Sequence, residues 1–130
     1  MDKLSVLREC NRVLKLGGNV AGYVIYVPAG LTGAQERRAA DLGPPDVTAL
    51  ASPEVLAQAA GLTIVAKEDV TDAFRSTCAA LAAARRDLEV ELRADEGDDF
   101  YEEERRKKSA MLLGIDEGLL CRSLVVANKR

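Results

Sequence analysis

Histidine and tryptophan are absent from this sequence, and only 4% of its residues are aromatic. Without histidine there is no imidazole for acid–base catalysis, for a Ser-His-Asp or Cys-His nucleophile, or for a His-ligated zinc site. Any chemistry must use carboxylates, Tyr, Lys, Cys or the reactivity of a cofactor. Much of the apolar content is alanine, which buries little area, so we expect a marginal core if the chain folds alone.

Cysteine is also scarce, and no C-x-x-C pair occurs. The three cysteines are far apart and have apolar neighbours: Cys10, Cys78 and Cys121. We expect buried free thiols in a reducing cytoplasm. No basic segment followed by an apolar run opens the chain, and no apolar stretch approaches the roughly 18 residues that span a membrane. These absences predict a soluble, cytoplasmic protein without a membrane partner.

Neither sign of charge dominates, with 18 Lys and Arg residues against 21 Asp and Glu residues. The net charge of -3 argues against non-specific nucleic-acid binding, which needs clustered cations. One basic run, residues 105–108, follows acidic residues at 99 and 102–104, so we expect a solvated helix face. With 48% hydrophobic residues, the chain can form one packed domain.

Helical periodicity alternates with short apolar runs along the chain. We expect helices over residues 2–16, within 32–43, and over 53–61, 71–95 and 98–118. We expect strands over residues 20–27, 62–70 and 119–127. The first strand is apolar at nearly every position, which is typical of a strand buried on both faces of a parallel sheet. This alternation predicts an α/β fold with helices on the faces of a sheet.

Two helix starts and two apolar stripes are visible in the pattern. Thr32 and Gln35 have capping-box spacing, and Ser52 before Pro53 is typical of a cap followed by a first turn. The long helical segments are expected to turn apolar residues toward the core: Phe74, Cys78, Leu81, Leu88 and Leu92 on the first, and Phe100, Met111, Leu112 and Ile115 on the second.

Residues 7–20 read LRECNRVLKLGGNV. This segment resembles the L-R-E-x-x-R-V-L-K-P-G-G-x-L stretch of class I S-adenosylmethionine-dependent methyltransferases, with Leu16 in place of proline. In that family the stretch is the helix and glycine turn before the fifth strand. Residues 52–62 resemble the helix and turn before the sixth strand. Residues 123–127 resemble the seventh strand, which runs antiparallel between strands five and six.

The resemblance covers essentially the whole chain and implies one partial domain, residues 1–130, with a partial Rossmann-like sheet of strands five, six and seven and flanking helices. The family binds S-adenosylmethionine at a glycine-rich turn after its first strand, and neither that turn nor the acidic residue after the second strand is present. Gly17 and Gly18 follow a helix and precede a strand, so they are expected to end a helix. We therefore expect no cofactor-binding and no metal-binding residue here, and the catalytic residues stay unassigned.

The resemblance also implies a partner. Strand five pairs with strand four in the family, so one edge of residues 20–27 is expected to be open, and an open apolar edge invites pairing with another chain. The expectation is a chain that is unstable alone, forms a homodimer, or is complemented by another polypeptide.

Ligands of open α/β sheets bind beyond the carboxyl ends of the strands. Tyr26 and Pro28 are therefore candidate substrate-binding residues, and Tyr101 and Arg105, one helical turn apart, are a second candidate pair. The alternatives are a half-buried strand tyrosine for Tyr26 and surface packing for the second pair. Asp69 and Asp72, which could act as an acid–base pair, are more simply helix caps.

The function that the resemblance implies is the acceptor-pocket half of a methyltransferase for a small molecule, inactive alone. A different hypothesis is a non-catalytic α/β fragment that binds a partner, or itself, through its open sheet edge. A third is a truncated product without a function of its own. Binding of S-adenosylmethionine separates the first hypothesis from the other two.

Overall fold

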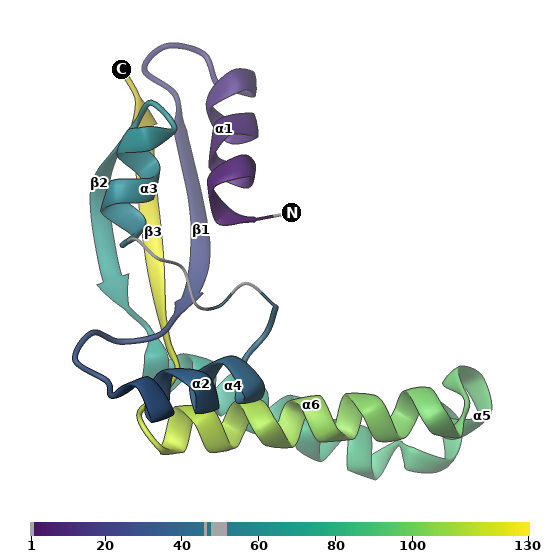
Figure 1. The fold of residues 1–130 in the computed structure, drawn as a ribbon. Coiled ribbons are helices and arrows are strands. Elements are labelled where there is room, and N and C mark those ends of the chain that lie inside the picture. Colours follow the sequence, from purple (N-terminus) through teal and green to yellow (C-terminus); the bar gives the residue numbers. More distant parts are fainter. Residues whose placement is uncertain (1, 46, 48–51) are drawn as a thin grey trace.

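The computed structural model describes residues 2–45, 47 and 52–130 (Figure 1). Its strands are β1 (Asn19–Tyr26), β2 (Leu62–Asp69) and β3 (Cys121–Lys129). Its helices are α1 (Lys3–Val13), α2 (Gly33–Leu42), α3 (Pro53–Ala59), α4 (Thr71–Asp87), α5 (Glu89–Glu96) and α6 (Asp98–Asp116). Figure 1 shows α1 and α3 on one side of the sheet, while α4, α5 and α6 form an arm that extends from one end of it.

The strand order β1-β3-β2 confirms the predicted partial sheet. The last strand lies in the middle and runs antiparallel to both neighbours, from Tyr26 opposite Cys121 to Asn19 opposite Asn128 on the β1 side. One prediction is wrong, because β1 is not buried on both faces: four of its eight residues are exposed. Within the described residues it is an edge strand, and an edge strand has only one neighbour to cover it.

Helix α1 begins as predicted but ends three residues early, at Val13 instead of Leu16. Asp2 caps it, its carboxylate accepting from the Ser5 N–H at 2.8 Å. The early end has a tertiary cause. The Lys129 ammonium donates to the carbonyls of Asn11 and Leu14, at 2.7 and 2.9 Å, so the last turn is bonded to β3 instead of continuing.

The predicted starts of the two short helices are confirmed. Thr32 and Gln35 form a complete capping box at α2, and the Ser52 hydroxyl accepts from the Val55 N–H at 3.3 Å at α3. The predicted bounds of β3 are shifted by two residues. Leu119 and Leu120 are not in the strand, because their N–H groups both donate to the carbonyl of Gly114 at the end of α6.

The first predicted long helix, residues 71–95, is two helices, because the chain bends at Leu88. The break before the second, at Gly97 with a φ of 89°, lies where it was predicted. Phe74 and Cys78 are buried as predicted, but Leu81 and Leu88 are about half exposed. The stripe is therefore covered only where α4 meets the sheet. Beyond that point the arm has only its own helices to pack against, and the apolar positions there face solvent.

Helix α6 also differs from its predicted packing. Ile115 is buried and Met111 and Leu112 pack against the core, as expected. Phe100, expected in the core, is 52% exposed, and its neighbour Tyr101 is buried instead, with 1% exposed. Neighbouring residues of a helix point about 100° apart, so only one of these two aromatic residues can face the core. The spacing of apolar residues did not show which one.

Two apolar clusters hold the described residues together. One joins Val47, Phe74, Cys78, Ile115 and Leu120 where the arm meets the sheet. The other joins Ala57, Leu62 and Ala127 beneath α1 and α3. Side chains alternate along a strand, so Val20, which packs on the second cluster, shares its face with Tyr26, whereas Tyr23 lies on the opposite face and is 62% exposed.

At the joint between α6 and β3, we expect an alanine substitution to lower stability, whereas the same substitution on β1 should not. In Gly114→Ala the new Cβ would lie 2.5 Å from Cδ1 of Leu120, which is fully buried and cannot move away. We expect the free energy of unfolding to fall by about 1–3 kcal/mol in urea titrations. The matched control is Gly22→Ala, where nothing lies within 4 Å of the new Cβ. Equal stabilities of the two variants would contradict the assigned joint.

Candidate functional site

The candidate site is a hollow of about 340 Å³ at the carboxyl end of β1. Its walls come from four elements: α1, the end of β1, the start of α3, and β2. Most of the lining is apolar, from Val24, Val27, Val47, Pro53 and Leu56. The polar groups that reach it include Tyr26, Lys67 and Lys3. An apolar hollow with a few converging polar groups is the usual form of a small-molecule site.

Tyr26 stands at the centre of the polar side of this hollow. The Ser123 hydroxyl, on the buried side of β3, donates to its phenolic oxygen at a long 3.5 Å. The Lys67 ammonium lies 5.6 Å from the centre of the Tyr26 ring, within cation–π range. The tyrosine is half-buried, so it lines the hollow and also packs on the sheet.

Lys67 is held in place by a carboxylate from α3. Its ammonium lies 3.1 Å from Oε1 of Glu54. The pKa of Glu54 is lowered, first by a hydrogen bond from its own backbone N–H and then by Lys67. Both side chains are partly exposed, so the pair contributes little to stability and mainly orients the ammonium. Lys3 completes the polar side and donates to the carbonyl of Ile25 at 2.8 Å.

The four predicted substrate-binding residues fall in two separate places. Tyr26 lines the hollow, and Pro28 is half-buried just beyond the end of β1. Tyr101 and Arg105 lie on α6, in the part of the arm that extends away from the sheet (Figure 1). The structure therefore does not bring the two predicted pairs together.

Tyr101 and Arg105 line a second hollow, of about 650 Å³, between α4 and α6. The Tyr101 hydroxyl donates to the carbonyl of Arg85 at 3.1 Å, and the guanidinium carbons of Arg93 and Arg85 lie 4.4 and 5.4 Å from its ring centre. Arg105 is exposed and donates to Glu102 at 2.9 Å. These contacts tie the helices of the arm to one another, which favours the packing interpretation.

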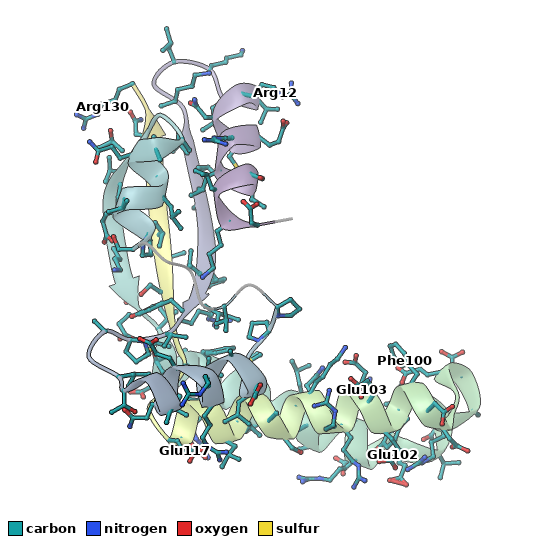
Figure 2. The ribbon with its side chains drawn as sticks, viewed as in Figure 1. Arg12, Phe100, Glu102, Glu103, Glu117 and Arg130 are labelled. Carbon is teal, nitrogen blue, oxygen red and sulfur yellow. The ribbon has the colours of Figure 1, made fainter. Side chains whose placement is uncertain are left out.

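The helices of the arm carry many ion pairs, and the basic residues 105–108 take part in them. Glu102, Glu103 and Glu104 pair with the four cations that follow them. Figure 2 shows Glu102 and Glu103 on opposite sides of α6 and Phe100 near its outer end. The run is therefore paired within α6, as the charge pattern predicted, but it extends around the helix and does not form a single solvated face, and Lys108 is half-buried.

Asp69 and Asp72 lie at the start of α4. Oδ1 of Asp69 accepts from the Thr71 N–H at 2.8 Å, and bonds from Thr71 lower the pKa of Asp69. Asp72 is in the first turn, where the helix dipole favours an acid. Both positions agree with stabilisation of the helix start.

The cysteines are free thiols, but only Cys78 is buried; Cys10 and Cys121 are half-buried. Burial raises the pKa of the Cys78 and Cys121 thiols. Among the residues that the structure describes, no group of three His, Cys, Asp or Glu side chains could hold a metal ion. None of the described helices is both long and apolar enough to cross a membrane.

Sequence reasoning missed Lys3 and Lys67, which line the hollow, and Glu54 and Ser123, which contact Lys67 and Tyr26. The available signal was Lys67, the first of three charged residues near the end of the predicted strand. The bulge between Ile64 and Ala66 shifts the β2 register and places Lys67 on the same face as Tyr26. A bulge is not visible in the residue pattern, so the sequence alone did not indicate which face Lys67 takes.

No protein-family model and no curated protein matches the chain. Solved structures do. A protein from Galdieria sulphuraria assigned as a sarcosine dimethylglycine methyltransferase is 21% identical, covers 98% of this chain and 47% of its own, and has a TM-score of 0.80. The cyclopropane synthase MmaA2 from Mycobacterium tuberculosis is 13% identical over 97% of this chain and 49% of its own, with a TM-score of 0.72.

A third match is phosphoethanolamine N-methyltransferase 2 from Haemonchus contortus, in complex with phosphomonomethylethanolamine and S-adenosylhomocysteine. It is 16% identical, covers 98% of this chain and 30% of its own, and has a TM-score of 0.73. At these identities the matches show the fold. They confirm the resemblance to part of the S-adenosylmethionine-dependent methyltransferase fold, and the chain spans about half the length of most of these structures.

The buried hydroxyl of Tyr101 makes the packing interpretation testable. In Tyr101→Phe the carbonyl of Arg85 loses its phenolic donor, so we expect the free energy of unfolding to fall by about 1 kcal/mol. Tyr23→Phe, at an exposed position, is the control and should change stability by less than about 0.5 kcal/mol. Urea titrations measure both. A neutral Tyr101→Phe would remove the argument that this tyrosine is structural.

Proposed function

We propose that this chain is the acceptor-pocket half of an S-adenosylmethionine-dependent methyltransferase that acts on a small molecule. The observation that supports this most is the match of nearly the whole chain to about half of several methyltransferase structures. The hollow at the carboxyl end of β1 supports it further, because that is where ligands of open α/β sheets bind.

The acceptor would lie against Tyr26, with Pro28 at the rim of the site. The apolar walls exclude water and the half-buried phenol offers a hydrogen bond, which are the two things that orientation of a small acceptor requires. Lys3 and Lys67 place two ammonium groups on one side of the hollow, and that of Lys67 is paired with Glu54. An acceptor with an anionic group fits that charge.

The described residues do not fit the cofactor itself. The one glycine pair that could be mistaken for a cofactor loop uses its amides within the chain: the Gly17 N–H donates to the carbonyl of Lys129 at 2.7 Å and the Gly18 N–H to that of Lys15 at 2.9 Å. No step of methyl transfer is therefore assigned to these residues. Other polypeptide, either an extension of this chain or a second one, would hold S-adenosylmethionine.

The free edge of β1 is where that polypeptide would join. The strand is eight residues long and pairs only with β3 among the described strands. Its outer backbone groups, apart from the Ile25 carbonyl that accepts from Lys3, are available to another strand. On this proposal the chain by itself binds no cofactor and does not catalyse methyl transfer.

Titration calorimetry with S-adenosylmethionine tests the proposal. The purified 130-residue protein, shown to be folded by its circular dichroism, should give no saturable heat. Micromolar binding would overturn the assignment of the cofactor site to other polypeptide. The matched experiment uses the protein extended by the in-frame codons upstream of Met1. We expect saturable S-adenosylmethionine binding by the extended protein and none by the 130-residue protein. An extended protein that is folded and still binds nothing would count against the methyltransferase function.

A second function, a non-catalytic fragment that associates through β1, is favoured by the same free edge. Gel filtration with light scattering separates it from the first. A stable homodimer that binds no S-adenosylmethionine, with or without the extension, would support association as the function. A monomer that gains cofactor binding when extended would support the methyltransferase.

A further inference from the structure

Arg122 occupies an unusual place at the start of β3. It stands opposite Ile25 in the sheet register, on the face that carries Tyr23 and not on the face covered by α1 and α3. Its guanidinium carbon lies 4.2 Å from the centre of the Tyr23 ring and 4.7 Å from that of Phe74. One ring comes from an edge strand and the other from the first turns of α4, so the guanidinium is clamped from two elements.

This guanidinium has aromatic neighbours but no oxygen acceptor among the residues that the structure describes. Its Nε is buried and makes no hydrogen bond. Seven other arginines of the described chain pair with carboxylates: Arg12, Arg38, Arg75, Arg85, Arg93, Arg105 and Arg106. Arg85 also has a buried Nε without a partner, but its two terminal nitrogens bond Glu96. Arg122 lacks even that.

An arginine in this setting is ready to bind an oxyanion. The rings replace part of its hydration and fix the plane of the fork, while leaving its N–H groups without acceptors. A fixed guanidinium plane matches carboxylate and phosphate oxygens two at a time. Nε is buried, but Arg122 as a whole is only half-buried, and Tyr23 beside it is exposed on a sheet face that α1 and α3 do not cover, so an anion can approach the outer end of the guanidinium.

We propose that Arg122, clamped by Tyr23 and Phe74, is a binding site for the carboxylate or phosphate group of a small molecule. It is separate from the hollow at Tyr26, because neighbouring strand positions alternate faces and Tyr26 stands opposite Cys121, not Arg122. The site does not depend on the proposed methyltransferase function. It uses only this chain's own residues, so the 130-residue protein suffices to test it.

The probes are acetate and inorganic phosphate, titrated separately against sodium chloride at equal ionic strength. The readout is the side-chain Nε–Hε NMR resonance of Arg122, assigned by its loss in Arg122→Lys. Saturable movement of this resonance with acetate marks a carboxylate site, and with phosphate a phosphate site; either supports the proposal. Movement with chloride alone to the same extent, or none with either probe, would overturn it.

Variants provide a second test. Anion binding to them is measured from the backbone amide resonances of residues 23 and 122. Arg122→Lys keeps the charge but loses the fork, so binding should weaken about tenfold, the loss of one charged hydrogen bond. Tyr23→Leu keeps Arg122 and removes one ring, which should weaken binding about threefold. Arg86→Lys, at an exposed position of α4, is the matched control and should leave binding unchanged.

Two results in the variants would contradict the site. One is equal weakening by Arg122→Lys and Arg86→Lys, which means that general positive charge attracts the anion. The other is unchanged binding in a folded Arg122→Lys and a folded Tyr23→Leu. If Arg122→Lys does not fold, Tyr23→Leu alone decides, because it leaves the guanidinium in place.

Discussion

The antiparallel pairing of β3 between β1 and β2 is the interaction on which the rest of the structure depends. Among the strands that the structure describes, β1 and β2 do not pair with each other, so each is held in the sheet by β3. Lys129, at the end of β3, also donates to two carbonyls at the end of α1, about 115 residues away in sequence. Closing such a long loop costs conformational entropy before any of these contacts forms, and the completed sheet must offset that cost. Loss of the C-terminal strand would therefore dissolve the sheet.

The arm meets the sheet where α6 leads into β3 and where α4 begins beside β3, the Arg122 N–H donating to the Thr71 hydroxyl at 3.1 Å. Leu120 is fully buried beside Gly114, and the carbonyl of Gly114 accepts from the two residues that lead into β3. Farther out, α4, α5 and α6 are held by Tyr101 and by arginine–carboxylate pairs such as Arg85 with Glu96. Exposed pairs contribute little each, but several together around one buried tyrosine keep the three helices in register. The joint thus connects an apolar sheet region to a largely polar arm.

Several features of the chain could be predicted from local rules. The caps at Asp2, Thr32 and Ser52 depend on residues within three positions of one another, so the sequence pattern located them correctly. The order of the three strands followed from the resemblance of residues 7–20, 52–62 and 123–127 to the family. The site was predicted only in part: Tyr26 lines the hollow, but Lys67 reaches it through a bulge, and Tyr101 turned inward where Phe100 was expected.

The sequence by itself determined the helix starts other than that of α5, the strand positions to within two residues, and the absence of imidazole chemistry, because each depends on composition or on close neighbours. Tertiary structure alone decided where α1 ends, which face Lys67 takes, and how Arg122 comes to lie between Tyr23 and Phe74. Those outcomes depend on register between strands and on packing between elements far apart in the chain. A one-residue slip in register reverses the face of every side chain in a strand, and no local pattern specifies it.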